Sequence, residues 1–241
     1  MNRFITALLD FFFPPLCHVC RTFIPDAGPL HICPACLEQM KAVGQPLCHI
    51  CGIPFIGAGA DHICGNCHKQ PPSYDAARAA FIYDGHCRTL IHSFKYNNKI
   101  HLRRPLALLA GQRLQEFIST RAPDLIIPVP LHVKRLRSRG FNQAVLLGEL
   151  LARVWRLPLE RQALKRVRWT EPQINLSADK RHDNVKGAFA VSAGFAVAGK
   201  RVLLIDDVLT TGSTAKECAT VLKRAGAIDV TVITVARAVT Y

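Results

Sequence analysis

Several features are missing from this sequence of 241 residues, and each absence excludes a class of protein. No run of about 18 or more apolar residues occurs, so we expect no membrane-spanning helix. Neither GxxxxGKS/T nor GxGxxG is present, which removes the two commonest phosphate-binding loops. The first 17 residues resemble an export signal, but they contain Asp10 and lack a small-residue cleavage site. We therefore expect a short packing helix that ends at Pro14 and Pro15, and a cytoplasmic protein.

Acidic residues are scarce, because 17 Asp and Glu stand against 31 Lys and Arg and leave a net charge of +14. The excess is uneven along the chain. Residues 1–72 hold four residues of each sign, whereas residues 132–186 hold thirteen basic and five acidic residues. A basic block of this kind suits a polyanionic substrate and suits nucleic acid equally, so charge alone does not choose between them.

Eight of the ten cysteines form four CxxC pairs, and these pairs repeat with a shift of 31 residues. The shift superimposes PLCHVC at 15–20 on PLCHIC at 46–51. Each unit offers four thiolates on two tight turns, which is typical of a tetrahedral zinc site. The sequence therefore predicts two structural Zn²⁺ ions with these ligands: Cys17, Cys20, Cys33 and Cys36 in the first unit, and Cys48, Cys51, Cys64 and Cys67 in the second.

Disulfides and redox-active CxxC motifs are the alternative interpretations of these cysteines. Disulfides need an oxidising compartment, which no export signal supports, and redox CxxC motifs do not normally occur four at a time. Pairing within a repeat is favoured over an interleaved arrangement, because each repeat is complete by itself. Units of about 30 residues bury little core, so we expect the metal to supply their folding energy.

Residues 70–73 (QPPS) separate this N-terminal module, residues 1–72, from a second domain at 73–241. In the second domain, apolar runs alternate with amphipathic helical patterns. The expected strands are 76–83, 124–130, 201–205 and 228–235, and the expected helices are 86–96, 102–117, 141–154 and 213–225. This alternation predicts an α/β fold with a parallel sheet, right-handed crossovers and flanking helices, whereas residues 158–190 are polar and irregular.

The most informative stretch is VLLIDDVLTTGST at 202–214, which predicts a strand, a small-residue turn and a helix start. Free N–H groups at a helix start bind phosphate, and glycine lets the backbone approach it. The expected phosphate-binding residues are Thr210, Thr211, Gly212, Ser213 and Thr214. Asp206 and Asp207 would repel phosphate, so we expect them to hold ribose hydroxyls directly or through Mg²⁺. The alternative is an ordinary strand-to-helix turn with a Ser/Thr cap.

A second set of candidate residues follows the strand expected at 124–130. The set has four cations within six residues, and arginine forks match pyrophosphate oxygens: Lys134, Arg135, Arg137 and Arg139. Ligands of open α/β sheets bind at this carboxyl edge of the strands. We expect the four cations to act together on both pyrophosphate ligands and DNA. The alternative is a solvated basic loop.

These motifs resemble known families. IDDVLTTGST at 205–214 is similar to the phosphoribosyl pyrophosphate signature of type I phosphoribosyltransferases. PVPL at 128–131, RGFNQ at 139–143 and the cysteine repeat resemble the ComF/GntX family, phosphoribosyltransferase-like proteins with an N-terminal double zinc ribbon. The resemblance also implies a mobile loop that closes over the substrate, with residues Arg166, Arg168, Gln173, Arg181 and Asn184. Lys95, in HSFKY, matches a recurrent position of the family.

The resemblance implies a phosphoribosyltransferase that displaces pyrophosphate from C1 of the ribose, with an acceptor that the sequence leaves open. Some family members are linked to DNA uptake in natural competence. The alternative function is therefore an accessory protein of DNA uptake or repair, which binds single-stranded DNA and a protein partner and uses the ribose phosphate site for a strand end. The balanced charge of residues 1–72 disfavours the ribbons as the main contact with DNA.

Overall fold

The computed structural model of the chain describes residue 12 and residues 14–25, 27–169 and 185–239. The helix expected before Pro14 and the expected loop residues Gln173, Arg181 and Asn184 lie outside the described residues. None of the helices in the described ranges is long and apolar enough to cross a membrane.

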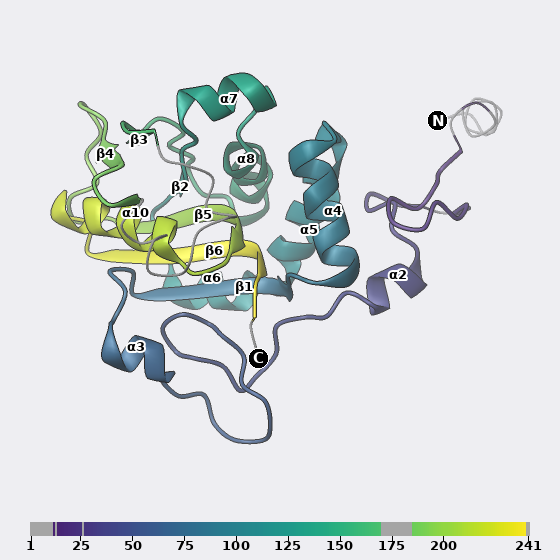
Figure 1. Cartoon of the computed structure of the whole chain (residues 1–241), viewed down its shortest axis with the longest axis horizontal. Coiled ribbons are helices and arrows are strands. Elements are labelled where there is room, and N and C mark those ends of the chain that lie inside the picture. Colours follow the sequence, from purple (N-terminus) through teal and green to yellow (C-terminus); the bar gives the residue numbers. More distant parts are fainter. Residues whose placement is uncertain (1–11, 13, 26, 170–184, 240–241) are drawn as a thin grey trace.

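A four-stranded parallel sheet forms the centre of the molecule (Figure 1). Its strands are, in spatial order, β1 (Ala76–Ile82), β6 (Asp229–Arg237), β5 (Arg201–Leu209) and β2 (Leu125–Pro128). β5 pairs with β6 over its whole length, from Arg201 opposite Asp229 to Leu209 opposite Arg237. The parallel α/β sheet predicted from the alternating pattern is confirmed.

Helices cover both faces of the sheet, which is the usual requirement of a parallel sheet. One face carries α4 (Gly85–Tyr96), α5 (Arg103–Arg113) and α8 (Gln143–Trp155), and the other carries α10 (Ser213–Arg224) (Figure 1). The side chains of β5 alternate accordingly. Leu203 and Ile205 pack with the first set of helices, and Val202 and Leu204 pack with α10.

The remaining elements differ from the expected ones in several places. The helix expected at 102–117 is divided at Leu114 into α5 and α6 (Gln115–Arg121), after the short 3-10 helix η1 (Ile100–Leu102), and Ile118 of α6 still reaches the common core. The polar segment at 158–190 contains β3 (Leu164–Arg166) and the start of β4 (Phe189–Val191), and the two strands form a separate antiparallel pair. β5 continues beyond the expected end at 205, because β6 pairs with it as far as Leu209.

The basic stretch after β2 is a helix, α7 (Val133–Arg139), and not a loop. The His132 side chain accepts a hydrogen bond from the N–H of Lys134 at 3.2 Å and so caps the helix start. Gly140 ends the helix with a φ of 81°, a left-handed conformation that glycine adopts without strain. Caps at both ends explain why so short and highly charged a segment is helical.

The two cysteine units occupy different places (Figure 1). The first unit, with α2 (Pro34–Glu38), lies to one side of the domain beyond α4, and the second, with α3 (Gly65–Lys69), lies under the sheet. Residues 41–43 connect them and bond to β1, where the N–H of Val43 donates to the Ala80 carbonyl at 3.2 Å. Cys48, Cys51 and Cys67 belong to the same apolar cluster as the sheet and α10. The second unit therefore shares a core with the domain, contrary to the expectation that metal alone stabilises it.

Candidate functional site

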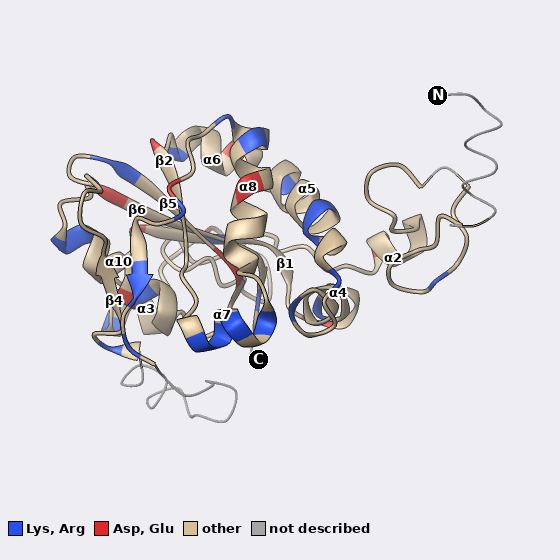
Figure 2. Ribbon diagram, turned by 90° about the horizontal axis from the view of Figure 1, so that it is seen from above, with Lys and Arg blue, Asp and Glu red and all other residues tan. Residues whose placement is uncertain are grey.

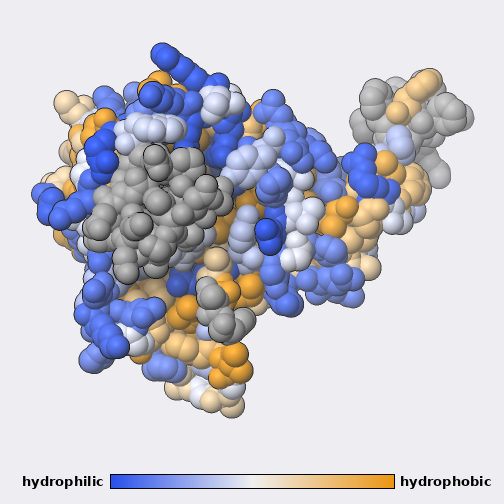
Figure 3. Space-filling model, viewed as in Figure 1, coloured by the Kyte–Doolittle hydropathy of each residue, from blue (hydrophilic) through white to orange (hydrophobic). Residues whose placement is uncertain are grey.

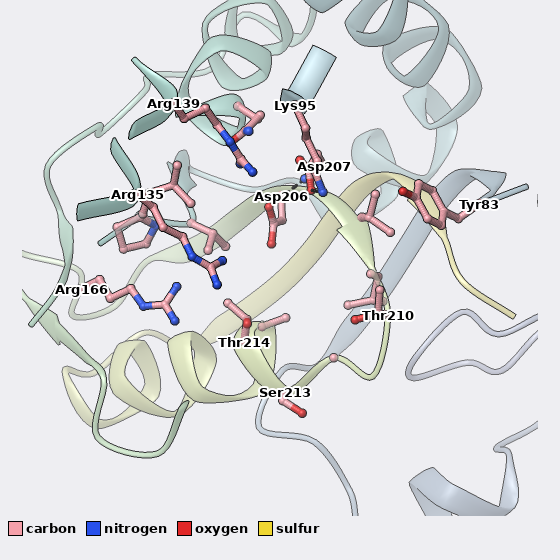
Figure 4. A pocket seen from close by; sticks show the side chains of 18 of the residues that line it. Tyr83, Lys95, Arg135, Arg139, Arg166, Asp206, Asp207, Thr210, Ser213 and Thr214 are labelled. Atoms are coloured by element: carbon pink, nitrogen blue, oxygen red, sulfur yellow. Dashed lines mark hydrogen bonds and ion pairs between the residues drawn. The ribbon is translucent and has the colours of Figure 1, made fainter. Parts of the chain in front are cut away.

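A cavity of about 680 Å³ opens at the carboxyl ends of β2 and β5 (Figure 4). Its walls come from segments far apart in the chain: the residue after β1, the end of α4, the segment from β2 through α7, the strand β3, and residues 206–215. The location agrees with the general rule that open α/β sheets bind ligands at this edge.

The start of α10 forms one wall of the cavity. Gly212, in a left-handed conformation with a φ of 78°, is the last residue before the helix. The hydroxyls of Thr211 and Ser213 lie 2.9 Å apart, and the Ser213 N–H donates to the Thr211 hydroxyl at 3.4 Å. Thr210, Gly212, Ser213 and Thr214 line the cavity, and Thr211 supports Ser213 from outside the lining. The positive end of the α10 dipole therefore faces the cavity.

The two adjacent carboxylates have different environments. Asp207 is buried, and its Oδ1 lies 2.8 Å from the Nζ of Lys95, which comes from the last turn of α4. Burial alone would lower the pKa of Lys95, but the charge and hydrogen bond of Asp207 raise it above its usual value. Lys95 and Asp207 thus form a buried ion pair that ties α4 to β5.

Asp206 points into the cavity from the floor (Figure 4). Its Oδ1 accepts a hydrogen bond from the N–H of Asp207 at 2.9 Å. Within the part of the chain that the structure describes, no lysine or arginine forms an ion pair with it. Burial and then the charge of Asp207 raise the pKa of Asp206 to about 7. Asp206 is therefore the carboxylate that is available to a ligand.

Three guanidinium groups face Asp206 and the start of α10 across the cavity (Figure 4). Arg135 and Arg139 come from α7, and Arg166 is the last residue of β3. Burial and then the charge of Arg135 lower the pKa of Arg166, and burial and the charge of Arg139 lower that of Arg135. Like charges held this closely favour the entry of an anion.

The α7 helix separates the four expected cations into two pairs. Arg135 and Arg139 are four residues apart and share the face toward the cavity, as successive turns of a helix require. Lys134 and Arg137 are not among the residues that line the cavity. Figure 2 shows α7 as a largely basic helix, in blue, at the edge of the molecule. The first pair therefore faces the cavity, and the second pair lies outside it.

Aromatic side chains lie at the rim of the cavity beside these cations. The Lys134 Nζ is 5.5 Å and the Arg135 Cζ 5.8 Å from the centre of the Trp169 indole ring. The Arg139 Cζ is 5.0 Å from the centre of the Tyr96 ring. Both rings are partly exposed, at 37% for Trp169 and 52% for Tyr96. Each ring is thus positioned by a cation and still has surface left for a ligand.

Gln143, the first residue of α8, is a site residue that the sequence reasoning noted only as part of RGFNQ. It lines the cavity, is 2% exposed, and its Nε2 is buried without a hydrogen-bond partner among the described residues. Buried amide groups in proteins are normally hydrogen-bonded. The free N–H therefore points to a ligand acceptor. The expected loop residue Arg168 lies elsewhere and donates to the Lys186 carbonyl at 2.7 Å.

The eight expected zinc ligands gather into two sites, each within one repeat. The four sulfur atoms of each unit lie within 4.8 Å of one another. The Sγ atoms of Cys20 and Cys33 are 3.7 Å apart, and those of Cys51 and Cys64 are 3.8 Å apart. A tetrahedron with Zn–S bonds of about 2.3 Å has edges of about 3.8 Å, so the residues fit the ion. The chain has two four-cysteine zinc sites.

Comparison with known families identifies both parts of the chain. The "Double zinc ribbon domain" family matches residues 8–68, and the "Phosphoribosyl transferase domain" family matches residues 147–240. The order of the two domains is the one that the cysteine repeat and the 202–214 motif predicted.

Similar proteins are known from several bacteria. "Competence protein F" of Haemophilus influenzae is 37% identical over 174 residues, which are 70% of this chain and 76% of that protein. "DNA utilization protein YhgH" of Salmonella typhi is 36% identical over 170 residues, which are 68% of this chain and 73% of that protein. The solved glutamine phosphoribosylpyrophosphate amidotransferase of B. subtilis, complexed with ADP and GMP, aligns with 59% of this chain and 30% of its own at 22% identity, with a TM-score of 0.37.

Proposed function

The chain belongs to the ComF/GntX family, which joins a double zinc ribbon to a phosphoribosyltransferase domain, and on that premise we propose that its cavity binds phosphoribosyl pyrophosphate, or a related ribose 5-phosphate, with Mg²⁺. The observation that carries the proposal is the composition of the cavity. Asp206 and the start of α10 stand on one side of it, and three arginines stand on the other. Such a cavity offers separate places for a phosphate, a ribose and a pyrophosphate.

The 5-phosphate would bind at the turn 210–214, where the α10 dipole and the hydroxyls supply positive charge and donors. The ribose hydroxyls would reach Asp206, directly or through Mg²⁺, since hard cations prefer carboxylate oxygens. Asp207 would act differently, because Lys95 already neutralises it. Its role would be to hold the floor of the cavity in place.

The pyrophosphate would bind on the opposite wall. Arg135, Arg139 and Arg166 converge there, and guanidinium forks bind phosphate oxygens with two hydrogen bonds each. The Gln143 amide supplies a further donor. The charge of this wall would stabilise pyrophosphate as it leaves.

The reaction that this arrangement supports is phosphoribosyl transfer. The C1–O bond to pyrophosphate breaks, a bond forms between C1 and a nitrogen of the acceptor, and that nitrogen loses a proton. The protein contributes positioning and electrostatic stabilisation of an oxocarbenium-like state. The aromatic rim formed by Trp169 and Tyr96 suits an acceptor with a flat ring.

The proposed function is tested by calorimetric titration of the protein with phosphoribosyl pyrophosphate and Mg²⁺, and with ribose 5-phosphate as a second ligand. We expect the double variant Arg135→Gln/Arg139→Gln to lose affinity for phosphoribosyl pyrophosphate about ten- to a hundredfold. The affinity of the same variant for ribose 5-phosphate, which has no pyrophosphate, should fall far less. The Lys134→Gln/Arg137→Gln variant is the matched control, because it removes the same charge outside the cavity. An equal loss for both ligands, or no binding to the wild type, would contradict the proposal.

A second candidate function, binding of single-stranded DNA, is favoured by the pairing of Trp169 and Tyr96 with the cations of α7. Proteins that bind single strands combine stacked aromatic rings with basic grooves. The names of the similar proteins mention competence and DNA utilization. In this candidate, Lys134 and Arg137 would bind phosphates outside the cavity, and a protein partner of DNA uptake would bind elsewhere.

The DNA candidate predicts that Lys134→Gln/Arg137→Gln weakens binding of a labelled oligonucleotide. If each residue contacts one phosphate, the slope of log affinity against log salt should become shallower by about 1.4. Fluorescence anisotropy at several salt concentrations measures both quantities. An unchanged slope would show that Lys134 and Arg137 do not contact the DNA phosphates.

A further inference from the structure

The second zinc site is built into the core of the phosphoribosyltransferase domain. Its turn between the first two ligands rests on β1, where the N–H of Ala77 donates to the Ile50 carbonyl at 2.6 Å. A Cβ added to Gly52, the residue after Cys51, would lie 2.3 Å from the Ala77 carbonyl oxygen. The backbones are therefore in direct contact, and a displacement of this zinc site would displace the sheet.

Arg237, the last residue of β6, connects the second zinc site to the sheet electrostatically. It is 7% exposed, and its guanidinium donates to the Cys51 carbonyl at 2.6 Å and to the Cys51 Sγ at 3.5 Å. A buried cation is stable only beside opposite charge. Four thiolates around Zn²⁺ would carry a net negative charge and would supply that partner through Cys51. Arg237 thus contacts both the backbone and the sulfur of one zinc ligand.

The end of β6 in turn fixes the end of β5. Arg237 is the register partner of Leu209, and the N–H of Ala238 donates to the Leu209 carbonyl at 2.9 Å. Leu209 belongs to the same apolar cluster as Cys51 and Cys67. The turn 210–212 begins directly after Leu209, so the position of Arg237 sets the position of the phosphate-binding turn.

Tyr74 makes a second connection between the same two places. It is 6% exposed, packs in the cluster that contains Cys48 and Cys67, and its hydroxyl oxygen lies 3.4 Å from the point that a Cβ on Gly212 would occupy. Its neighbours in the chain are held on α10 by side-chain contacts of 2.7 Å, between Ser73 and Thr220 and between Asp75 and Lys223. The tyrosine ring therefore supports the turn from below.

The first zinc site packs in a different cluster. Cys17 and Cys36 belong to the apolar cluster of α4, α5 and α8, which does not contain Leu209, and the His18 ring lies 4.9 Å from the His101 ring beside α4. Figures 1 and 2 both show this unit at the opposite end of the molecule from α10. Figure 3 shows apolar surface over the second unit, below the sheet.

We propose that Arg237 and Tyr74 are positioning residues that couple the second zinc site to the turn 210–214, so that the cavity binds a phosphate ester strongly only while Cys48, Cys51, Cys64 and Cys67 hold zinc. The first zinc site does not take part in this coupling. The proposal rests on the proposed function in one respect, namely that the turn 210–214 binds phosphate. Because coupling between two sites is reciprocal, ligand in the cavity must also stabilise zinc in the second site.

The test uses the full chain loaded with zinc and a chromophoric chelator that reports zinc release. At equilibrium with the chelator, we expect saturating ribose 5-phosphate to raise the affinity of the protein for one zinc equivalent by on the order of tenfold and to leave the other unchanged. The Cys20→Ser variant lacks a ligand of the first site and should retain only the zinc of the second site. Protection of that remaining zinc by ribose 5-phosphate would identify the second site as the protected one. This variant should bind ribose 5-phosphate with the affinity of the wild type.

Variants of the positioning residues separate coupling from folding. Arg237→Gln should still bind both zinc ions, but ribose 5-phosphate should no longer protect the second zinc, and its affinity should fall about tenfold. Arg237→Lys keeps the charge, so it should restore part of the protection. If Arg237→Gln does not fold, Tyr74→Phe takes its place, because it removes only one hydroxyl. Tyr74→Phe should weaken the binding of ribose 5-phosphate and leave the zinc content unchanged. Ribose 5-phosphate binding without protection of either zinc overturns the coupling alone. No binding of ribose 5-phosphate to the wild type overturns the proposed function and the coupling with it.

Discussion

Gly212→Val should abolish detectable binding of ribose 5-phosphate. Gly212 has a φ of 78°, a conformation that a β-branched residue adopts only with strain, and it sets the direction in which α10 begins. An added Cβ would lie 3.4 Å from the Tyr74 hydroxyl and 3.8 Å from the Leu209 Cδ1, so the further methyl groups of valine would press on both. The turn would open, and the N–H groups of the helix start would lose their convergence. Losing two or more charge-assisted contacts corresponds to on the order of a hundredfold or more in affinity.

Gly194→Val is the matched control for this experiment. Gly194 has a similar φ of 86°, and a Cβ added there meets nothing within 4 Å. It lies outside the cavity, between β4 and β5, so the substitution carries the same kind of backbone strain without reaching the turn. Calorimetry should find unchanged ribose 5-phosphate affinity in Gly194→Val. A similar loss in both variants would show that general destabilisation, and not the turn, causes the effect.

Asp206→Asn should weaken phosphoribosyl pyrophosphate with Mg²⁺ about ten- to a hundredfold and, at the same time, raise the melting temperature. The first effect follows from the loss of the available carboxylate in the cavity. The second follows from the environment of Asp206, where burial and the charge of Asp207 disfavour ionisation. A neutral amide of the same shape avoids that cost, so we expect a gain of roughly 1–3 kcal/mol in the free energy of unfolding at pH 8.

The contribution of Asp206 to the free energy of unfolding depends on pH, and its direction follows from the raised pKa. Asp206 has a pKa of about 7 in the folded chain against an ordinary value of 3.8, so the folded state keeps a proton that the unfolded state releases. Its contribution to stability is therefore most favourable below about 4, falls between about 4 and 7, and is constant above 7. The affinity for phosphoribosyl pyrophosphate with Mg²⁺ should instead increase as the pH rises toward 7, because a bound metal needs the ionised carboxylate. Both dependences should disappear in Asp206→Asn.

Asp207→Asn supplies the contrasting variant at the neighbouring position. It removes the carboxylate that pairs with Lys95 at 2.8 Å and leaves a largely buried ammonium group without that partner. We expect it to lower the free energy of unfolding by roughly 2 kcal/mol, opposite in sign to Asp206→Asn. Chemical denaturation of the two variants at pH 8 measures both changes. Stabilisation by both substitutions would show that the ion pair does not hold the floor of the cavity.

Local spacing was sufficient to predict the parts of this protein whose residues are neighbours in the chain. The repeat of cysteines at 31-residue spacing fixed the two four-cysteine sites, because each CxxC turn presents its own thiolates. The unit from β5 through α10 to β6 was predicted within a few residues, since its hydrophobic periodicities are strong and its turn is short. The end of β5 was not predicted correctly, because its last residues are in the strand only through their pairing with β6.

Contacts between distant segments were beyond the sequence alone. No helix was expected for the basic stretch 133–139, whose four cations were expected to act together, and the helix that forms there directs Arg135 and Arg139 toward the cavity. Asp206 and Asp207 were expected to share one role, and Lys95, more than 100 residues earlier in the chain, gives them different ones. Gly140 after the basic stretch is a local signal of a helix end, whereas the pairing of Asp207 with Lys95 has no signature in the spacing of the residues.

The sequence by itself determined the composition of this protein's sites: the zinc thiolates, the acidic pair, the small-residue turn and the basic block. Only the tertiary structure decided which carboxylate is available, which arginines reach the cavity, and that the second zinc site shares a core with the turn 210–214. The physical reason is that motifs follow from local backbone geometry, whereas pKa values, charge pairing and shared cores depend on which distant segments the fold brings together.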